Sequence, residues 1–113
     1  MKAVYSKEEY KRLKRIAKIN GIRFFAVELA DQYYPYNGVS IAYREAFPGK
    51  DCVMLEVAAS YCASTDEFKN KHGKFYAIDK FCSGEFIKVP LANFYREEGG
   101  KATENVLASM FIV

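Results

Sequence analysis

The sequence predicts a single α+β domain, residues 1–113, with a mainly antiparallel sheet of four or five strands. Three observations lead to this fold class. Residues 6–21 have the pattern of an amphipathic helix, short apolar runs alternate with turn signals over residues 22–89, and the last residues return to helical spacing. Short turns between neighbouring strands favour antiparallel pairing over crossover connections. We therefore expect a basic N-terminal helix on one face of the sheet, a short middle helix and a C-terminal helix.

The N-terminal helix is marked at its start. Ser6 is a good N-cap, and Glu9 three residues later completes a capping box. Tyr5 and Tyr10 occupy the two positions of a hydrophobic staple. These signals predict a helix that begins directly after Ser6.

The end of this helix is marked as well, and its two faces differ. Asn20-Gly21 tolerates positive φ, and Ile22 is the apolar residue that follows a Schellman cap. Four apolar residues share one face by their three- and four-residue spacing: Tyr10, Leu13, Ile16 and Ala17. A cationic stripe follows the same spacing elsewhere on the helix: Lys7, Lys11, Lys14 and Lys18, flanked by Arg12 and Arg15.

The next segments predict two strands joined by a tight turn. Residues 22–30 are a nearly continuous apolar run that predicts a buried strand, although periodicity alone leaves a helix open. Residues 31–38 contain Pro and Asn-Gly and predict a loop. Residues 39–47 alternate apolar and polar or small side chains, which is typical of a half-exposed strand. The Pro-Gly turn at 48–51 then leads into a second buried strand, residues 52–59, as an antiparallel hairpin.

The second half of the chain is expected to add a helix and another hairpin. Thr65 resembles an N-cap, and Gly73 is the predicted end of a short helix. Residues 74–81 and 85–89 are predicted as strands, with Gly84 available for positive φ between them. Pro90 is expected to end the ladder.

The two ends of the chain leave alternatives open. After a possible helical turn at 91–98, residues 103–113 have helical spacing with Thr103 as a cap, but a last strand is the alternative. Residues 2–5 form a short strand in a variant fold, in which the first thirty residues make a βαβ unit. We favour the antiparallel arrangement because that strand is very short.

Charge is distributed unevenly along the chain. The formal net charge is +3, but residues 1–23 hold eight cations and two anions, whereas residues 24–113 hold nine cations and twelve anions. The N-terminal helix is therefore the cationic end of the molecule. Its stripe either meets an anion, such as nucleic acid, an acidic protein or lipid headgroups, or faces solvent. The residues assigned to a nucleic-acid surface are Lys7, Lys11, Lys14, Arg15, Lys18, Lys71 and Lys74, with Phe75, Tyr76, Tyr33, Tyr34 and Tyr36 as stacking candidates.

Three tyrosines in the predicted loop 31–38 suggest a protein interface. Tyr33, Tyr34 and Tyr36 surround Pro35, where they are difficult to bury together. Exposed tyrosines give a large contact area at a low entropic cost, as interface anchors do. The alternative is that the rings lie back on the sheet.

Catalytic and metal signatures are weak. The spacings of Cys52, Cys62 and Cys82, with a single His72, match no common metal pair, and no metal or cofactor is predicted. A nucleophilic pair of Cys82 and His72 rests on proximity in sequence alone. The three acids within apolar runs, Glu28, Glu56 and Asp79, would form a catalytic pair only if two faced each other, and outward orientation is favoured.

These observations favour a small non-enzymatic binding or inhibitor-type protein that acts through a protein partner, of a kind that phages and mobile elements encode. Tyr33, Tyr34 and Tyr36 would anchor the partner, and Lys7, Lys11, Lys14 and Lys18 would guide it. Nucleic-acid binding is the alternative, followed by an enzyme with an unrecognised site. We expect a cytoplasmic protein with free thiols and no transmembrane segment. Homo-oligomers through the apolar segment 106–113 are also consistent with the sequence.

Overall fold

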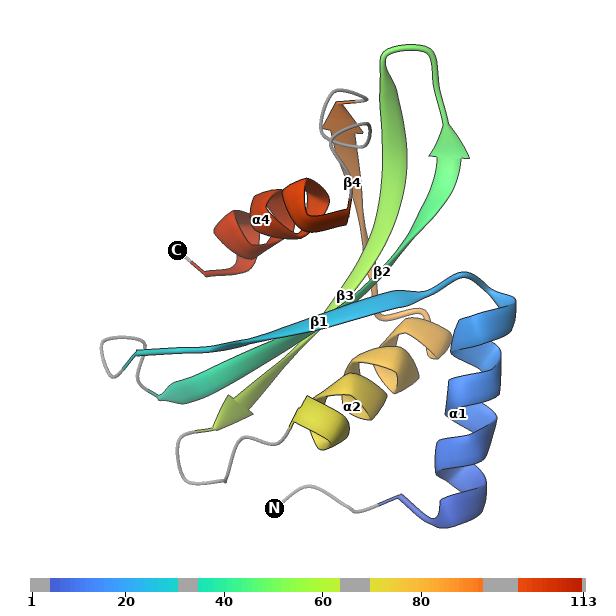
Figure 1. The fold of residues 1–113 in the computed structure, drawn as a ribbon, viewed down its shortest axis with the longest axis vertical. Coiled ribbons are helices and arrows are strands. Elements are labelled where there is room, and N and C mark those ends of the chain that lie inside the picture. The colour runs from blue at the N-terminus through green and yellow to red at the C-terminus, as the bar shows by residue number, and fades with distance from the viewer. Residues whose placement is uncertain (1–4, 31–34, 64–69, 93–99, 113) are drawn as a thin grey trace.

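A computed structural model describes residues 5–30, 35–63, 70–92 and 100–112. It shows one four-stranded antiparallel sheet with helices packed against it, which confirms the predicted α+β class (Figure 1). The elements in chain order are α1 (Lys7–Ile19), β1 (Arg23–Glu28), β2 (Tyr36–Pro48), β3 (Cys52–Ala63), α2 (Asn70–Cys82), β4 (Ile87–Ala92) and α4 (Gly100–Phe111). No helix in this described part of the chain is long and apolar enough to cross a membrane.

The strands lie in the order β1-β2-β3-β4, and each pairs antiparallel with the next. The predicted turn at 48–51 does join β2 and β3, and Gly49 N–H donates to Cys52 O at 2.9 Å. A Cβ atom at Gly49 would lie 2.6 Å from that carbonyl oxygen, so this turn requires glycine.

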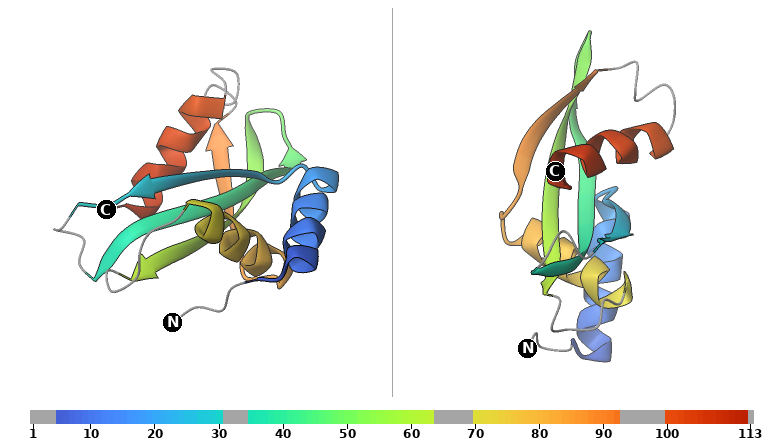
Figure 2. Two further views of the ribbon diagram at one scale, coloured as in Figure 1. Left: turned by 60° about the horizontal axis from the view of Figure 1, so that its bottom comes forward. Right: turned by 90° about the vertical axis from the view of Figure 1, so that its left-hand side faces the viewer.

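One face of the sheet holds the larger apolar core and is covered by α4. Figures 1 and 2 show the strands passing between α4 on one side and α1 with α2 on the other. From α4, Leu107 is fully buried in this core, and Val106, Phe111 and Ile112 pack against it. The strands supply the remaining buried side chains: Val39, Ile41, Tyr43, Val53, Leu55, Val57, Val89 and Leu91.

The opposite face is covered by α1 and α2 and is built differently. Its buried cluster takes Leu13 and Ala17 from α1, Phe75, Ala77 and Ile78 from α2, and only Ala42 from the sheet. Three further strand residues that point this way are small and buried, namely Ser40, Ala58 and Ser60. Small side chains on the sheet let α2 lie close to it, with Cα atoms within 8 Å of β2 and β3.

This arrangement corrects the prediction that residues 39–47 form a half-exposed strand. The alternation of Val39 and Ile41 with Ser40 and Ala42 is real, but all four residues are buried. The small residues are not on a solvent face, because they lie under a helix. The alternating pattern of residues 39–47 therefore reflects a difference in side-chain size between the two faces rather than a difference in exposure.

The predicted strand 74–81 is wrong, since these residues belong to α2. Phe75, Ile78 and Phe81 are buried at three-residue steps, which is helical spacing, and Gly73 lies inside the helix rather than ending it. Gly84 does have positive φ, at 81°, as predicted, but it follows a helix and not a strand. The second hairpin therefore does not exist, and Thr65 lies outside the described residues.

The last strand and the last helix also differ from their predicted bounds. β4 continues past Pro90, which lies opposite Met54 in the ladder instead of ending it, and Leu91 is paired where a helical turn was predicted. The C-terminal segment is helical, which excludes the strand alternative, but Thr103 is buried within α4 and is not its cap. Of the residues in the βαβ variant's short first strand, Tyr5 is in no strand, and residues 2–4 lie outside the described residues.

Candidate functional site

Helix α1 is fixed at its N-terminus as the sequence predicts. The Ser6 hydroxyl accepts a hydrogen bond from the Glu9 N–H at 3.2 Å, and the Ser6 N–H donates to Glu9 Oε1 at 3.1 Å. The hydrogen bond from the Ser6 backbone N–H to this carboxylate, with a smaller contribution from the Ser6 side chain, lowers the pKa of Glu9 below its ordinary value. The staple forms too, with the rings of Tyr5 and Tyr10 in edge contact at 5.7 Å. The capping box and staple are thus confirmed.

The C-terminus of α1 is a Schellman motif, also as predicted. The Ile22 N–H donates to Ala17 O at 2.9 Å, the Gly21 N–H donates to Lys18 O at 3.4 Å, and Gly21 has φ of 65°. The helix is therefore held firmly at both ends, which gives its outer surface a defined shape.

The outer surface of α1 is cationic, and its basic side chains are not ion-paired within the described residues. All six of its basic residues are exposed, and none forms an ion pair with another described residue: Lys7, Lys11, Arg12, Lys14, Arg15 and Lys18. Ile19 on the last turn is 74% exposed, more than any other large apolar side chain in the described part of the chain. Arg12, Arg15 and Ile19 follow one another at steps of three and four residues, so this apolar side chain lies beside cations.

The predicted tyrosine loop is only partly described. Tyr33 and Tyr34 lie outside the described residues, whereas Tyr36 begins β2 rather than lying in a loop. Tyr36 is 43% exposed, and its ring lies 5.1 Å from that of Tyr61. The Tyr61 hydroxyl donates to Phe111 O at 3.1 Å, which ties this ring pair to the end of α4. Burial, with a contribution from Tyr36, raises the pKa of Tyr61.

The structure does not bring Tyr36 and the cationic face of α1 together. Arg44 contacts Asn20 at the end of α1, and Arg44 lies eight positions after Tyr36 in β2, which is roughly 26 Å along the strand. In Figure 1 α1 lies at the right of the molecule, and β1 and β2 meet at the left. A partner that contacts both features must therefore span this distance along β2.

The second group of nucleic-acid candidates is used for packing. Lys74 lies on α2 with its Nζ 5.7 Å from the centre of the Phe24 ring and 5.9 Å from that of Phe75. Phe75 is buried against Tyr10, and Tyr76 packs against Tyr5, so neither ring is available to stack on bases. The side chain of Lys71 lies outside the described part of the structure.

The three acids are separated rather than paired. Glu28 is exposed at the end of β1, and Asp79 lies on α2, where it accepts a hydrogen bond from the Tyr5 hydroxyl at 2.9 Å. Glu56 is buried, contrary to the outward orientation we favoured, and forms an ion pair with Arg44 at 2.7 Å. Among the described residues, no group of three or more His, Cys, Asp or Glu side chains is placed to hold a metal ion.

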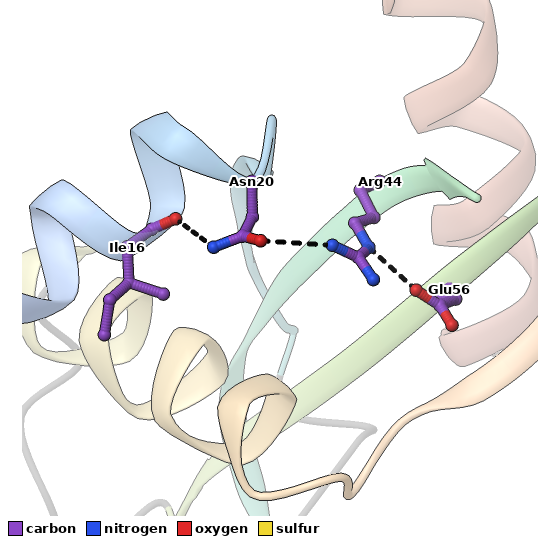
Figure 3. Close-up of polar contacts among 4 residues, drawn as sticks. All are labelled: Ile16, Asn20, Arg44 and Glu56. Carbon is purple, nitrogen blue, oxygen red and sulfur yellow. Dashed lines mark hydrogen bonds and ion pairs between the residues drawn. The ribbon is translucent and has the colours of Figure 1, made fainter.

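The Arg44–Glu56 pair is a polar link that the sequence interpretation missed (Figure 3). The two residues face each other across the β2–β3 hairpin, and Arg44 Nη1 also donates to Asn20 Oδ1 at 3.5 Å. Its guanidinium lies 5.4 Å from the centre of the Phe81 ring. The sequence did contain a signal for this ion pair. Arg44 and Glu56 are equally far from the turn at Lys50, and such residues lie opposite each other in an antiparallel hairpin.

Cys82 and His72 do not form a nucleophilic pair. Both lie on α2, ten positions apart, so their backbones are separated by roughly 15 Å along the helix axis. Partial burial, with the nearby Asp79 carboxylate, raises the pKa of the Cys82 thiol, although Arg12 opposes this effect. A raised pKa is the opposite of what an activated thiolate needs.

Comparisons with protein-family models, with curated proteins and with solved structures find no match for this chain. The candidate site therefore rests on its own geometry. Of the features described, the exposed face of α1 combines six exposed cations with an exposed apolar side chain, Ile19.

Proposed function

We propose that the chain is a small non-enzymatic binding domain, of inhibitor type, that acts through a protein partner with an acidic surface. The outer face of α1 is the contact surface. The observation that supports this proposal most directly is the set of six exposed cations on α1, none of which has an ion-pair partner among the described residues. Such a face steers and orients a partner of opposite charge.

Ile19 favours a protein over a nucleic acid as the partner. An exposed isoleucine beside Arg15 offers an apolar contact surrounded by charge, which resembles the centre and rim of a protein interface. Nucleic-acid surfaces on single strands instead use exposed aromatic rings for stacking. The rings nearest α1, Tyr10 and Phe75, pack against each other.

Nucleic-acid binding stays the second candidate because the same cations suit phosphates. The tyrosine pair Tyr36–Tyr61 is a separate apolar surface at the other end of the sheet. Its contribution to partner binding is tested independently of α1, by Tyr36→Ala.

The test is affinity capture from the native host with the folded wild-type protein and matched variants. Lys11→Glu with Lys14→Glu reverses two charges on α1, and Lys50→Glu with Lys101→Glu makes the same change in net charge elsewhere. We expect the first pair to weaken capture at least about tenfold and the second to leave it within about twofold. Equal capture by both pairs would remove α1 from the interface.

A second comparison separates the two partner classes. Ile19→Ser keeps every cation but removes the apolar contact, so it should weaken a protein complex by roughly tenfold and leave nucleic-acid binding unchanged. Mixed-sequence DNA and RNA are tested directly at several salt concentrations. Tight binding that falls steeply with salt and is insensitive to Ile19→Ser would establish the nucleic-acid alternative instead.

A further inference from the structure

The two edges of the sheet differ in their free backbone groups. At the β1 edge, the Leu29 N–H donates to Asn37 O at 3.0 Å. This bond shows which residues of β1 direct their backbone N–H and C=O groups toward β2. Antiparallel pairs alternate between those that exchange hydrogen bonds and those that do not. Consequently Phe24, Ala26 and Glu28 direct their N–H and C=O groups away from β2, and no described strand accepts them.

The β4 edge is blocked. Following the same alternation through β2 and β3 places Lys88, Pro90 and Ala92 with their backbone groups outward, so the middle position of this edge has no N–H to donate. β3 extends beyond β4, and there Lys80 Nζ donates to Ala59 O at 3.1 Å. That bond occupies a carbonyl that points away from β2, as the alternation of hydrogen-bonded pairs requires. Proline and lysine are two of the devices that prevent a sheet edge from pairing.

The β1 edge has neither device. Between exposed Arg23 and exposed Glu28, its four residues are apolar and only half-buried. In Figure 1, β1 crosses in front of β2 and β3. An apolar edge strand whose outward N–H groups meet no other described strand is a template for strand addition.

We propose that β1 pairs antiparallel with β1 of a second copy of this chain, across a two-fold axis that passes beside Ala26. A two-fold axis perpendicular to the sheet keeps the same face of both copies on one side. Centred on Ala26, the pairing uses all three outward residues, with Ala26 opposite Ala26 of the partner subunit and Phe24 opposite Glu28 of the partner subunit. The two sheets then continue into one.

Charge complementarity selects a second copy as the occupant. Phe24 points toward α2, and Lys74 Nζ lies 5.7 Å from the centre of its ring. In the proposed register, Glu28 of the partner subunit stands opposite Phe24 and beside this ammonium group. Within one copy neither Lys74 nor Glu28 has an ion pair with a described residue. The two-fold axis makes the contact twice, and on the other face it sets Phe25 opposite Val27 of the partner subunit, a favourable cross-strand pair.

The test is a charge swap read out as oligomeric state by sedimentation equilibrium. We expect the wild-type chain to dimerise, and Glu28→Lys or Lys74→Glu alone to weaken the dimer by roughly tenfold, because two ion pairs become two repulsions. The double variant, Glu28→Lys with Lys74→Glu, should restore the wild-type dimer. Glu85→Lys, an exposed charge change elsewhere, should have no effect. Circular dichroism checks that each variant is folded.

Two further measurements make the inference refutable. Ala26→Pro removes the central outward N–H, as Pro90 does at the other edge, and should give a folded monomer. Met110→Glu changes the exposed apolar residue of α4 and should leave the dimer intact. The inference is overturned if the wild-type chain is monomeric at about 1 mM, if the charge swap fails to restore association, or if Met110→Glu dissociates the dimer. The lysines of α1 are not involved, so these outcomes are independent of the proposed partner surface.

Discussion

The two faces of the sheet solve the same packing problem in opposite ways. On the α4 face the strands supply the large side chains, and the helix adds Leu107 as its only fully buried apolar residue. On the other face α1 and α2 supply the large side chains, whereas the strand residues Ala42 and Ala58 are small and project little from the sheet. A helix can lie close to a sheet where the side chains on the strands are small, and it must lie further away where those side chains are large.

This difference makes opposite kinds of substitution damaging on the two faces. The α4 face depends on one large helix side chain that fills the space above large strand residues. The α2 face depends on small strand residues that leave room for the helix. The predictions below follow from this contrast, from the largest expected effect to the smallest.

Truncation of Leu107 should have the largest effect. Leu107→Ala removes a fully buried side chain and is expected to lower the free energy of unfolding by about 2–5 kcal/mol. Because α4 has no other fully buried apolar side chain, its amides should also lose protection in hydrogen exchange. Met110→Ala, on the exposed side of the same helix, should change stability by less than about 0.5 kcal/mol. Equal losses in the two variants would contradict the assigned role of Leu107.

Enlargement of a small residue should be damaging only beneath α2. Ala58→Leu is expected to cost about 1–3 kcal/mol in chemical denaturation, because its extra atoms meet a helix that already lies close. Ala59→Leu is the matched control, since it makes the same change one residue later on the other face, where the site is half-exposed. A larger cost for Ala59→Leu than for Ala58→Leu would reverse the proposed contrast.

The polar link on the α2 face should contribute less than either packing effect. A double-mutant cycle with Arg44→Ala and Glu56→Ala should give a coupling energy of about 1–2 kcal/mol. This value lies between those of exposed and buried pairs, because the side chain of Arg44 is 33% exposed and that of Glu56 is 9% exposed. A coupling energy near zero would mean that the ion pair in Figure 3 adds nothing to stability.

The smallest effects are expected from the buried tyrosine hydroxyls, and these depend on pH. Burial chiefly raises the pKa of Tyr43 above its ordinary value of 10.0, and the nearby Glu104 carboxylate raises it further. On the other face, burial and Asp79 do the same for the pKa of Tyr5. An unfolded chain releases these protons near pH 10, before the folded chain does. The contribution of these tyrosines to the free energy of unfolding is therefore fully present below pH 10 and falls as the pH rises further.

Replacing either tyrosine by phenylalanine tests this dependence. Tyr43→Phe and Tyr5→Phe should each cost about 0.5–1.5 kcal/mol at pH 7, because each removes one hydrogen bond. Each should also lose less stability than the wild-type chain between pH 9 and pH 11. The measurement is thermal unfolding across that range, and a steeper alkaline decline in the variants would show that the sign is wrong.

Local signals in the sequence were sufficient for α1 and for the β2–β3 hairpin. Ser6, Glu9 and Gly21 act through bonds to residues within five positions, so their roles are visible without tertiary structure. The same holds for Gly49, whose turn allows no side chain. Features of this kind depend on backbone geometry that neighbouring residues dictate.

The misread segments were those in which tertiary packing decides the outcome. Residues 74–81 contain aromatic residues typical of strands, but their burial at 75, 78 and 81 follows the surface of a sheet that lies elsewhere in the sequence. Pro90 is tolerated because β4 is an edge strand, and edge position is a property of the whole sheet. For the candidate site, the charge of α1 could be predicted from the sequence. Its distance from Tyr36 could not, because that distance depends on the length and direction of β2.

The strand order β1-β2-β3-β4 has a consequence for how the chain acquires its structure. Each strand is hydrogen-bonded to the strand before it in strand order; β1–β2 and β2–β3 join segments that are close in sequence, whereas α2 lies between β3 and β4. Low sequence separation between contacting residues is associated with fast folding. We expect the β2–β3 hairpin to form early and the sheet to grow in one direction during synthesis, with α4 closing the larger core only after residues 100–111 have been made.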